Sequence, residues 1–318
     1  MHCNWGVLGP GFIATRAVIP AMQRVPTVRL LAVASSNSAR AQYVAAQFGI
    51  GRPYSDYQAL LDDPDIHAVY IALPNHLHRS LTIRAALAGK HVLCEKPLAI
   101  TTAECDEMIL ACQQANVLLM EAVMYRFHPR MIVLKELLTT GELGDLRFLH
   151  TAFSFSFNAP ENYRARAEFG GGALLDVGSY CINAARWLSG SEPQELQAYT
   201  SYSHGTDIST SAILHFERDI VAHIQGSFTA AEHQVIEVVG TKAAVTAPLA
   251  FTAWIDDTTL LNIQRGATFE QRVFAPADPY QAMVAHFTDC VLEGASLLYL
   301  PSDGRATLRV LEMLRTEL

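Results

Sequence analysis

The sequence lacks any concentration of positive charge. Its 318 residues contain 23 lysines and arginines against 31 aspartates and glutamates, a formal net charge of −8 at pH 7. No run of basic residues offsets this balance locally. A nucleic-acid interface needs a basic stripe or patch. The composition therefore argues against nucleic acid as a partner.

Long apolar runs and paired cysteines are also missing. Residues 68–73 form an apolar stretch of strand length, far short of the roughly 20 residues that span a membrane. The first five residues lack the basic region and long apolar segment of a signal peptide. The six cysteines are scattered without a C-x-x-C pair, which is typical of buried thiols in a reducing compartment. We therefore expect a cytoplasmic protein with no membrane partner.

Apolar segments alternate with helical patterns in the N-terminal part of the chain. The expected strands are residues 5–8, 28–34, 68–73, 91–94 and 117–120, and the expected helices are 13–23, 39–48, 57–61, 80–88 and 102–114. This alternation implies parallel strands with helices on both faces of the sheet. The pattern predicts an α/β fold, with an N-terminal doubly wound parallel sheet of the Rossmann type over residues 1–122.

Consecutive strands dominate the chain after residue 125. They are expected at residues 146–157, 195–202, 210–216, 220–228, 234–239 and 253–264, with helices at 129–139, 173–188, 280–293 and 303–315. Strands joined by short turns favour antiparallel pairing. Residues 123–318 are thus predicted to form a C-terminal α+β domain with a large, mostly antiparallel open sheet.

A glycine-rich loop follows the first expected strand. Residues 9–14 read Gly-Pro-Gly-Phe-Ile-Ala, a G-x-G-x-x-A form of the dinucleotide-binding fingerprint. Gly9 permits the tight turn, Gly11 lets the backbone approach a pyrophosphate, and the helix N-terminus offers amide donors. The motif is weak alone, but here it heads an alternating β/α series. We expect Gly9, Gly11, Phe12 and Ile13 to bind a dinucleotide.

An acidic residue is missing where an NAD site usually has one. NAD-preferring domains place Asp or Glu at the end of the second strand, whereas residues 13–54 contain neither. The corresponding segment is Ser35-Ser36-Asn37, with Arg40 one helical turn later. These side chains can donate hydrogen bonds to a 2′-phosphate without repelling it. The prediction is NADP, with NAD still possible if Arg40 is only a solvated helix residue.

Two further segments are more specific. Residues 94–99 read Cys-Glu-Lys-Pro-Leu-Ala, and residues 170–180 read Gly-Gly-Gly-Ala-Leu-Leu-Asp-Val-Gly-Ser-Tyr. With the glycine-rich loop, and with residues 74–78 and 124–129, they resemble the Gfo/Idh/MocA oxidoreductases. That family includes glucose–fructose oxidoreductase, inositol dehydrogenases and dimeric dihydrodiol dehydrogenase. The resemblance implies an NAD(P)-dependent enzyme acting on CH–OH groups, and a C-terminal sheet that often forms a homodimer.

The resemblance also assigns site residues. It implies that Lys96 and Tyr180 sit beside the nicotinamide, that Glu95 lies near its ribose, and that the Lys96–Pro97 peptide is cis. Apart from the resemblance, we expect further cofactor contacts from Leu73, Asn75, His78 and Arg164. We expect substrate contacts from Lys96, Tyr125, Arg126, Asp176 and Tyr180, with Arg164 as an additional candidate, because aromatic faces and bidentate donors suit sugar rings. Many NADP-using relatives carry arginine where this chain has Ser36, so its phosphate contact must differ.

The same residues suit hydride transfer on chemical grounds. Such a reaction needs a group that exchanges the hydroxyl proton, and a tyrosine near a lysine ammonium can do so because the charge favours phenolate. Asp176 lies one helical turn before Tyr180 and would share its helix face. We predict Lys96, Tyr180 and Asp176 as catalytic residues. Tyr180 also fits a core position, because its helix is otherwise apolar.

The predicted function is NADP-dependent hydride transfer between nicotinamide and a carbonyl or hydroxyl of a sugar or related polyol. One alternative is a trans-1,2-dihydrodiol dehydrogenase. Another is a non-catalytic NADP-binding regulator, which would be expected to lose Lys96 or Tyr180. No metal is predicted, because the histidines at 76, 78 and 128 lack Cys or carboxylate neighbours at ligand spacing. Additional candidates for substrate contacts are Phe157, Tyr163 and Trp254.

Overall fold

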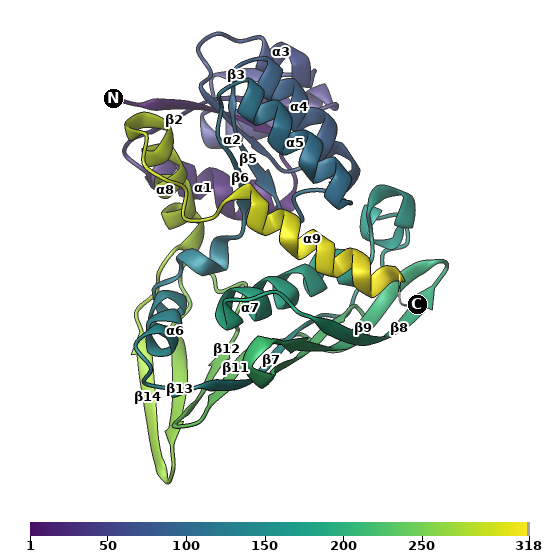
Figure 1. Ribbon diagram of the computed structural model, residues 1–318. Coiled ribbons are helices and arrows are strands. Elements are labelled where there is room, and N and C mark those ends of the chain that lie inside the picture. Colours follow the sequence, from purple (N-terminus) through teal and green to yellow (C-terminus); the bar gives the residue numbers. More distant parts are fainter. Residues whose placement is uncertain (317–318) are drawn as a thin grey trace. The chain divides into compact units, whose positions relative to one another are not determined.

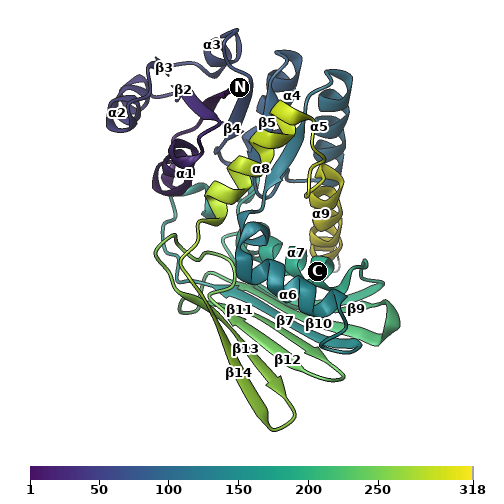
Figure 2. The same cartoon turned by 90° about the vertical axis from the view of Figure 1, so that its left-hand side faces the viewer.

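A computed structural model describes residues 1–316 of the chain (Figures 1 and 2). Its two compact units are Met1–Met124 with Pro279–Arg305, and Tyr125–Asp278 with the chain from Ala306 onward. The division falls inside helix α9 (Pro301–Thr316). Residues 317 and 318 of the predicted C-terminal domain lie outside the described residues. In residues 1–316, no helix is long and apolar enough to cross a membrane.

The first unit contains a six-stranded sheet in the order β3-β2-β1-β4-β5-β6. Every neighbouring pair in it is parallel. The strands are β1 (Cys3–Leu8), β2 (Val28–Ala34), β3 (Arg52–Tyr54), β4 (Ala68–Ile71), β5 (His91–Glu95) and β6 (Leu119–Ala122). The order reverses between β1 and β4, the kind of switch point at which doubly wound sheets bind ligands. The predicted Rossmann sheet is confirmed, and short β3 is an addition to it.

Helices flank this sheet along its length (Figure 2). They are α1 (Ile19–Arg24), α2 (Ser38–Phe48), α3 (Tyr57–Leu61), α4 (His78–Leu87), α5 (Thr102–Gln114) and α8 (Pro279–Glu293). The helix predicted over residues 13–23 opens with a π-helical turn, η1 (Ala14–Val18). Asn37, Asp56 and Thr101 each accept a backbone N–H at the start of a helix, the usual N-cap arrangement. From α8, Phe287 packs on the fully buried Trp5, with ring centroids 5.5 Å apart.

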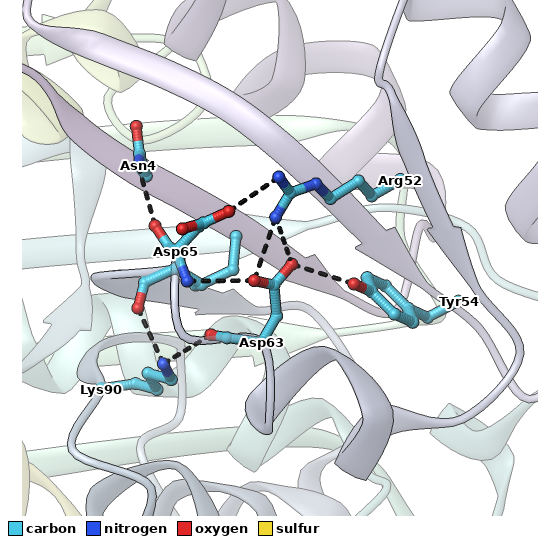
Figure 3. Close-up of polar contacts among 7 residues, drawn as sticks. Asn4, Arg52, Tyr54, Asp63, Asp65 and Lys90 are labelled. Atoms are coloured by element: carbon cyan, nitrogen blue, oxygen red, sulfur yellow. Dashed lines mark hydrogen bonds and ion pairs between the residues drawn. The ribbon is translucent and has the colours of Figure 1, made fainter.

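A polar cluster fixes the loop that leads into β4 (Figure 3). Asp63 accepts hydrogen bonds from Arg52 Nη1 at 2.7 Å and from the Tyr54 hydroxyl at 2.9 Å. The Lys90 ammonium donates to the carbonyl oxygens of Asp63 and Ile66, both at 2.8 Å. The buried lysine and the buried carboxylate are thus each satisfied by hydrogen bonds, as burial requires.

The second unit contains an eight-stranded sheet in the order β14-β13-β12-β11-β7-β10-β9-β8. The strands are β7 (Leu146–Ser154), β8 (Glu195–Ser203), β9 (Thr206–Phe216), β10 (Ile220–Ser227), β11 (His233–Gly240), β12 (Ala244–Pro248), β13 (Thr259–Arg265) and β14 (Thr268–Phe274). Strands β7 and β10 pair in parallel, and the other neighbours in the described residues pair antiparallel. The predicted large, mostly antiparallel sheet is confirmed.

Several predicted strand boundaries in this unit were wrong. The strand expected over residues 253–264 begins only at Thr259, because the preceding residues form a loop in which Asp257 accepts the Trp254 N–H at 2.7 Å. Strand β7 ends at Ser154 rather than at residue 157. Strands β12 and β14 were not predicted.

Helices α6 (Pro129–Thr139) and α7 (Ser179–Ser189) lie on one face of the eight-stranded sheet (Figure 1). The π-helical turn η6 (Leu174–Gly178) leads directly into α7. Gly226 permits this packing, because a Cβ there would lie 3.0 Å from the Gly178 Cα. The sheet thus brings η6 and the first turn of α7 against β10, which fixes the segment that carries Asp176 and Tyr180.

Candidate active site

The glycine-rich loop forms a tight turn that only glycine fits. Gly9 has a φ of +86°, and a Cβ there would lie 2.5 Å from the Leu73 Cδ2 and 2.7 Å from the Ala72 carbonyl oxygen. Gly11 is open, since its nearest neighbour would be 3.7 Å from an added Cβ. The exposed backbone at Gly11 fits the close approach of a pyrophosphate. Phe12 is exposed beside it, and Ile13 begins the helical turn.

Polar side chains gather at the end of β2. Asn37 caps α2 by accepting the Arg40 N–H at 3.1 Å, and the Ser35 hydroxyl accepts the Asn37 N–H at 3.2 Å. The Arg40 guanidinium reaches back to the glycine-rich loop, with Nη2 3.0 Å from the Pro10 carbonyl oxygen. Arg40 is therefore anchored beside the loop rather than only solvated. Together with exposed Ser36, this set can donate to a phosphate and contains no carboxylate.

The residues after β4 are more enclosed. His78 has no exposed surface, and its Nδ1 and Nε2 lie 2.9 and 2.8 Å from the carbonyl oxygens of Pro97 and Leu73. Burial lowers the pKa of His78, although the carbonyl contacts oppose that shift. Asn75 is also buried. His78 thus ties the loop after β4 to the loop after β5, and the Leu73 side chain abuts Gly9.

The Glu95-Lys96-Pro97 turn follows β5. The Tyr70 hydroxyl donates to Glu95 Oε1 at 2.5 Å, and the Lys96 N–H donates to Glu95 Oε2 at 3.3 Å. Burial raises the pKa of Glu95 against the effect of these two contacts. The Lys96–Pro97 peptide is cis, as predicted. After the turn, the Leu98 N–H donates to Glu121 Oε1 at 2.8 Å, a contact that the sequence did not predict.

In the second unit, Asp176 pairs with Arg164. Arg164 Nε lies 2.7 Å from Asp176 Oδ2, and its guanidinium lies over the Tyr163 ring at 4.9 Å from the centroid. The ion pair holds the Asp176 carboxylate in one orientation. Two residues predicted for different roles, one for the cofactor and one for catalysis, are therefore direct partners.

Tyr180 sits against an aromatic cluster. Its ring centroid lies 5.6 Å from that of Phe153, 5.5 Å from that of Phe251 and 6.1 Å from that of Tyr125. Tyr180 keeps 8% of its surface exposed. The ring is thus held firmly by its neighbours, which suits a positioned proton donor as well as a core residue.

The two residues predicted to contact substrate differ in their surroundings. Tyr125 is 1% exposed, and its hydroxyl donates to Asn183 Oδ1 at 2.6 Å. The Arg126 guanidinium lies over the Trp187 ring, 5.0 Å from its centroid. Both side chains pack against α7, which carries Asn183 and Trp187. Within this unit their visible contribution is to hold the helix that carries Tyr180.

Asp207 supports the segment that carries Asp176 and Tyr180, and the sequence analysis did not single it out. The Leu174 N–H donates to Asp207 Oδ2 at 2.6 Å, so a carboxylate from β9 caps the start of η6. Gly172 has a φ of +109°, and a side chain there would overlap this carboxylate. Burial raises the pKa of Asp207. The strand expected over residues 210–216 begins at Thr206 in the structure, so the sequence analysis placed Asp207 outside any strand.

Metal ligands do not gather in the described part of the chain. Among residues 1–316, no group of three or more His, Cys, Asp or Glu side chains could hold a metal ion. The six cysteines are all buried free thiols. The candidate residues of the first unit are therefore the glycine-rich loop, the polar end of β2 and the Lys96 turn, and those of the second unit lie in the Asp176–Tyr180 segment.

Comparison with known sequences gives matches over both units. Residues 3–123 match the Gfo/Idh/MocA oxidoreductase family with an NAD-binding Rossmann fold, and residues 131–246 match the Gfo/Idh/MocA C-terminal domain. An uncharacterized oxidoreductase of Rhizobium meliloti is 36% identical, over 98% of this chain and 96% of its own length. D-xylose 1-dehydrogenase (NADP(+)) 2 of Haloferax volcanii is 36% identical, over 91% and 89%. Trans-1,2-dihydrobenzene-1,2-diol dehydrogenase of Xenopus laevis is 30% identical, over 92% and 91%.

Solved structures resemble the fold closely. An aldose-aldose oxidoreductase from Caulobacter crescentus, complexed with glycerol, has a TM-score of 0.93 and 31% identity, covering 99% of this chain and 97% of its own. A 3-ketoreductase from Actinomadura kijaniata in complex with NADP has a TM-score of 0.90 and 28% identity, with 99% and 97% covered. Each of these solved structures therefore matches nearly the whole chain, including both of its units.

Proposed function

Since this chain belongs to the Gfo/Idh/MocA family of oxidoreductases with an NAD-binding Rossmann fold, we propose that it transfers a hydride between NADP(H) and a sugar or related polyol. The reacting carbon carries a carbonyl in one direction and a hydroxyl in the other. Relatives named as a D-xylose dehydrogenase and an aldose-aldose oxidoreductase support a sugar as substrate. The observation that carries the proposal is that Lys96 and Tyr180 are both retained, each on a tightly held segment.

The donor set at the end of β2 supports NADP. Arg40 is anchored at the Pro10 carbonyl, and Ser36 is exposed beside it. An acidic side chain, which would hold the ribose hydroxyls of NAD and repel a 2′-phosphate, is absent from residues 13–54. The residues that would hold the dinucleotide are Gly9, Gly11, Phe12, Ile13, Ser35, Ser36, Asn37 and Arg40.

The proposed chemistry divides between the cofactor and two side chains. When bound, the nicotinamide supplies or accepts the hydride. Tyr180 exchanges the hydroxyl proton, and the Lys96 ammonium favours the phenolate form that the exchange passes through. Asp176, held by Arg164, offers a fixed carboxylate to a substrate hydroxyl. This division assigns each retained residue a role that mutation can test.

A dihydrodiol is the second candidate substrate. The relative named trans-1,2-dihydrobenzene-1,2-diol dehydrogenase supports it, because that protein matches over 92% of this chain and 91% of its own length. A non-catalytic regulator is disfavoured, because it would have no need to keep both Lys96 and Tyr180.

A substrate panel tests the proposal. Aldoses, ketoses, inositols and trans-dihydrodiols are each incubated with NADP⁺, and the matching carbonyl compounds with NADPH, while absorbance of the reduced nicotinamide is followed. Turnover of a sugar or polyol supports the proposal, and turnover of dihydrodiols alone selects the second candidate. Binding of NADP without turnover of any panel member would instead favour a regulator. The absorbance spectrum of the purified protein reports whether it retains bound nucleotide.

A further inference from the structure

A buried carboxylate lies directly behind the Lys96 turn. Glu121, near the end of β6, is 3% exposed, and its Oε1 accepts the Leu98 N–H at 2.8 Å. Its Oε2 accepts the hydroxyl of Tyr299 at 2.6 Å. Strand β6 pairs with β5, so Glu121 stands opposite Cys94 and immediately beside the end of the strand that presents Lys96.

Residues close to the chain's C-terminus complete this arrangement. Tyr299 is 2% exposed and lies between α8 and α9. In the first turn of α9, a Cβ on Gly304 would lie 2.7 Å from Glu121 Oε2 and 3.5 Å from Leu98 Cδ2. Glycine at this position lets the helix close over the carboxylate. Leu98 itself has no exposed surface, so its amide has no access to water as a substitute partner.

The turn is therefore held on two sides. The Pro97 carbonyl oxygen lies 2.9 Å from His78 Nδ1, and the next amide, that of Leu98, is bonded to Glu121. Fixing both groups fixes the backbone from which the Lys96 side chain extends. Catalytic groups need placement within a fraction of an ångström, and a displacement of about 1 Å can cost about 10²-fold in rate.

We propose that Glu121 and Tyr299 are positioning residues for Lys96, acting through the Leu98 amide. The inference rests on the proposed function, in which Lys96 is catalytic. Glu121→Ala removes both hydrogen bonds, so we expect kcat to fall about 10²-fold while the Kd for NADPH stays within about threefold. The kcat of Glu121→Gln should stay within about fivefold of that of the unmodified protein, because the glutamine amide oxygen can still accept from the Leu98 N–H and its NH₂ can donate to the Tyr299 oxygen. The kcat of Tyr299→Phe should lie between those of Glu121→Ala and Glu121→Gln.

A matched control separates positioning from stability. Tyr54→Phe also removes a tyrosine-to-carboxylate hydrogen bond in the same unit, that to Asp63 at 2.9 Å, away from Lys96 (Figure 3). A loss of stability alone predicts that Tyr54→Phe and Tyr299→Phe behave alike per folded molecule. Positioning predicts that only Tyr299→Phe lowers kcat.

A spectroscopic readout makes the test independent of substrate. The chain has only four lysines, Lys90, Lys96, Lys135 and Lys242. Reductive ¹³C-methylation therefore gives few resonances, and Lys96→Met assigns the one of interest. Glu121→Ala should move the Lys96 resonance, and Glu121→Gln should leave it in place.

The outcomes separate the two hypotheses. An unchanged Lys96 resonance and full kcat in folded Glu121→Ala and Tyr299→Phe would overturn the positioning role. If Lys96→Met retained full activity, the proposed function would fail, while a resonance shifted in Glu121→Ala would still establish that Glu121 places Lys96. If Glu121→Ala does not fold, the comparison of kcat between Tyr299→Phe and Tyr54→Phe tests the positioning role instead.

Discussion

Replacing Arg40 with alanine is a direct test of the cofactor assignment. The guanidinium is bonded to the Pro10 carbonyl, and the Arg40 amide is capped by Asn37. The side chain is thus held beside the glycine-rich loop before any ligand arrives. We expect Arg40→Ala to weaken NADP binding and to leave NAD binding nearly unchanged, because NAD lacks the 2′-phosphate.

The size of the effect follows from exposure. A hydrogen bond to a charged group contributes about 1.5–3 kcal/mol. Arg40 is exposed, so solvent screening places its contribution at the lower end, about 1.5–2 kcal/mol. Since about 1.4 kcal/mol corresponds to a tenfold change, the Kd for NADPH should rise about 10–30-fold. Added salt should shrink the difference between parent and variant, because exposed charges are screened.

Fluorescence titration with NADPH and NADH measures both constants on the same protein. Arg79→Ala is the matched control, since Arg79 of α4 pairs with Glu107 and its loss changes the net charge equally. Ser36→Asp should go further and reverse the preference by placing a negative charge against the 2′-phosphate. An equal loss of both nucleotides in Arg40→Ala, or tighter NAD⁺ binding by the unmodified protein, would refute the reasoning.

The remaining predictions concern catalysis, stability and assembly. Tyr180→Phe should lower kcat about 10²–10⁴-fold with nearly unchanged cofactor affinity, and a fully active variant would exclude its role in proton exchange. Asp207→Ala removes the cap of η6 and should cost about 0.5–2 kcal/mol in urea unfolding, whereas an unchanged midpoint would contradict the capping role. Burial opposes ionisation of Asp63, but hydrogen bonds from Arg52 and Tyr54 keep its pKa below the ordinary value. Its contribution to stability is therefore present above about pH 3.9 and lost as pH falls through the lower folded-state pKa, so Asp63→Ala should flatten that acid limb of the unfolding curve. Strands β8 and β9 of the eight-stranded sheet expose Tyr199 and Ile213, so we expect a homodimer through this sheet, and a monomer by light scattering at micromolar concentration would count against it.

The sequence predicted the elements whose signals are local. The buried strands of the first sheet read as apolar runs, and Gly9 stands where a positive φ is needed. Strand β3 was missed because its three residues, Arg-Pro-Tyr, carry no apolar run. Strand β14 was missed because it lies at a sheet edge, where none of its residues is buried and no apolar run marks it.

Contacts between distant segments could not be predicted in this way. The amphipathic pattern of α8 predicts a helix, but it does not indicate that Phe287 packs on Trp5. Arg164 and Asp176 were both named as site residues, yet no spacing rule indicated that they form an ion pair. Sequence periodicity reports which face of an element is buried, and it does not report what the face is buried against.

Glu121 and Asp207 illustrate the same limit at the site itself. Each is a strand carboxylate that accepts one buried backbone amide, that of Leu98 after the Lys96 turn and that of Leu174 before Asp176 and Tyr180. A hydrogen bond to a backbone amide forms whatever side chain that residue carries. The residues around Lys96 therefore do not indicate that Glu121 binds the Leu98 amide. In each unit the residues proposed to perform chemistry are recognisable by type and spacing. The residues that hold them in place are recognisable only once the strands are paired, because their partner is an amide that every sequence has.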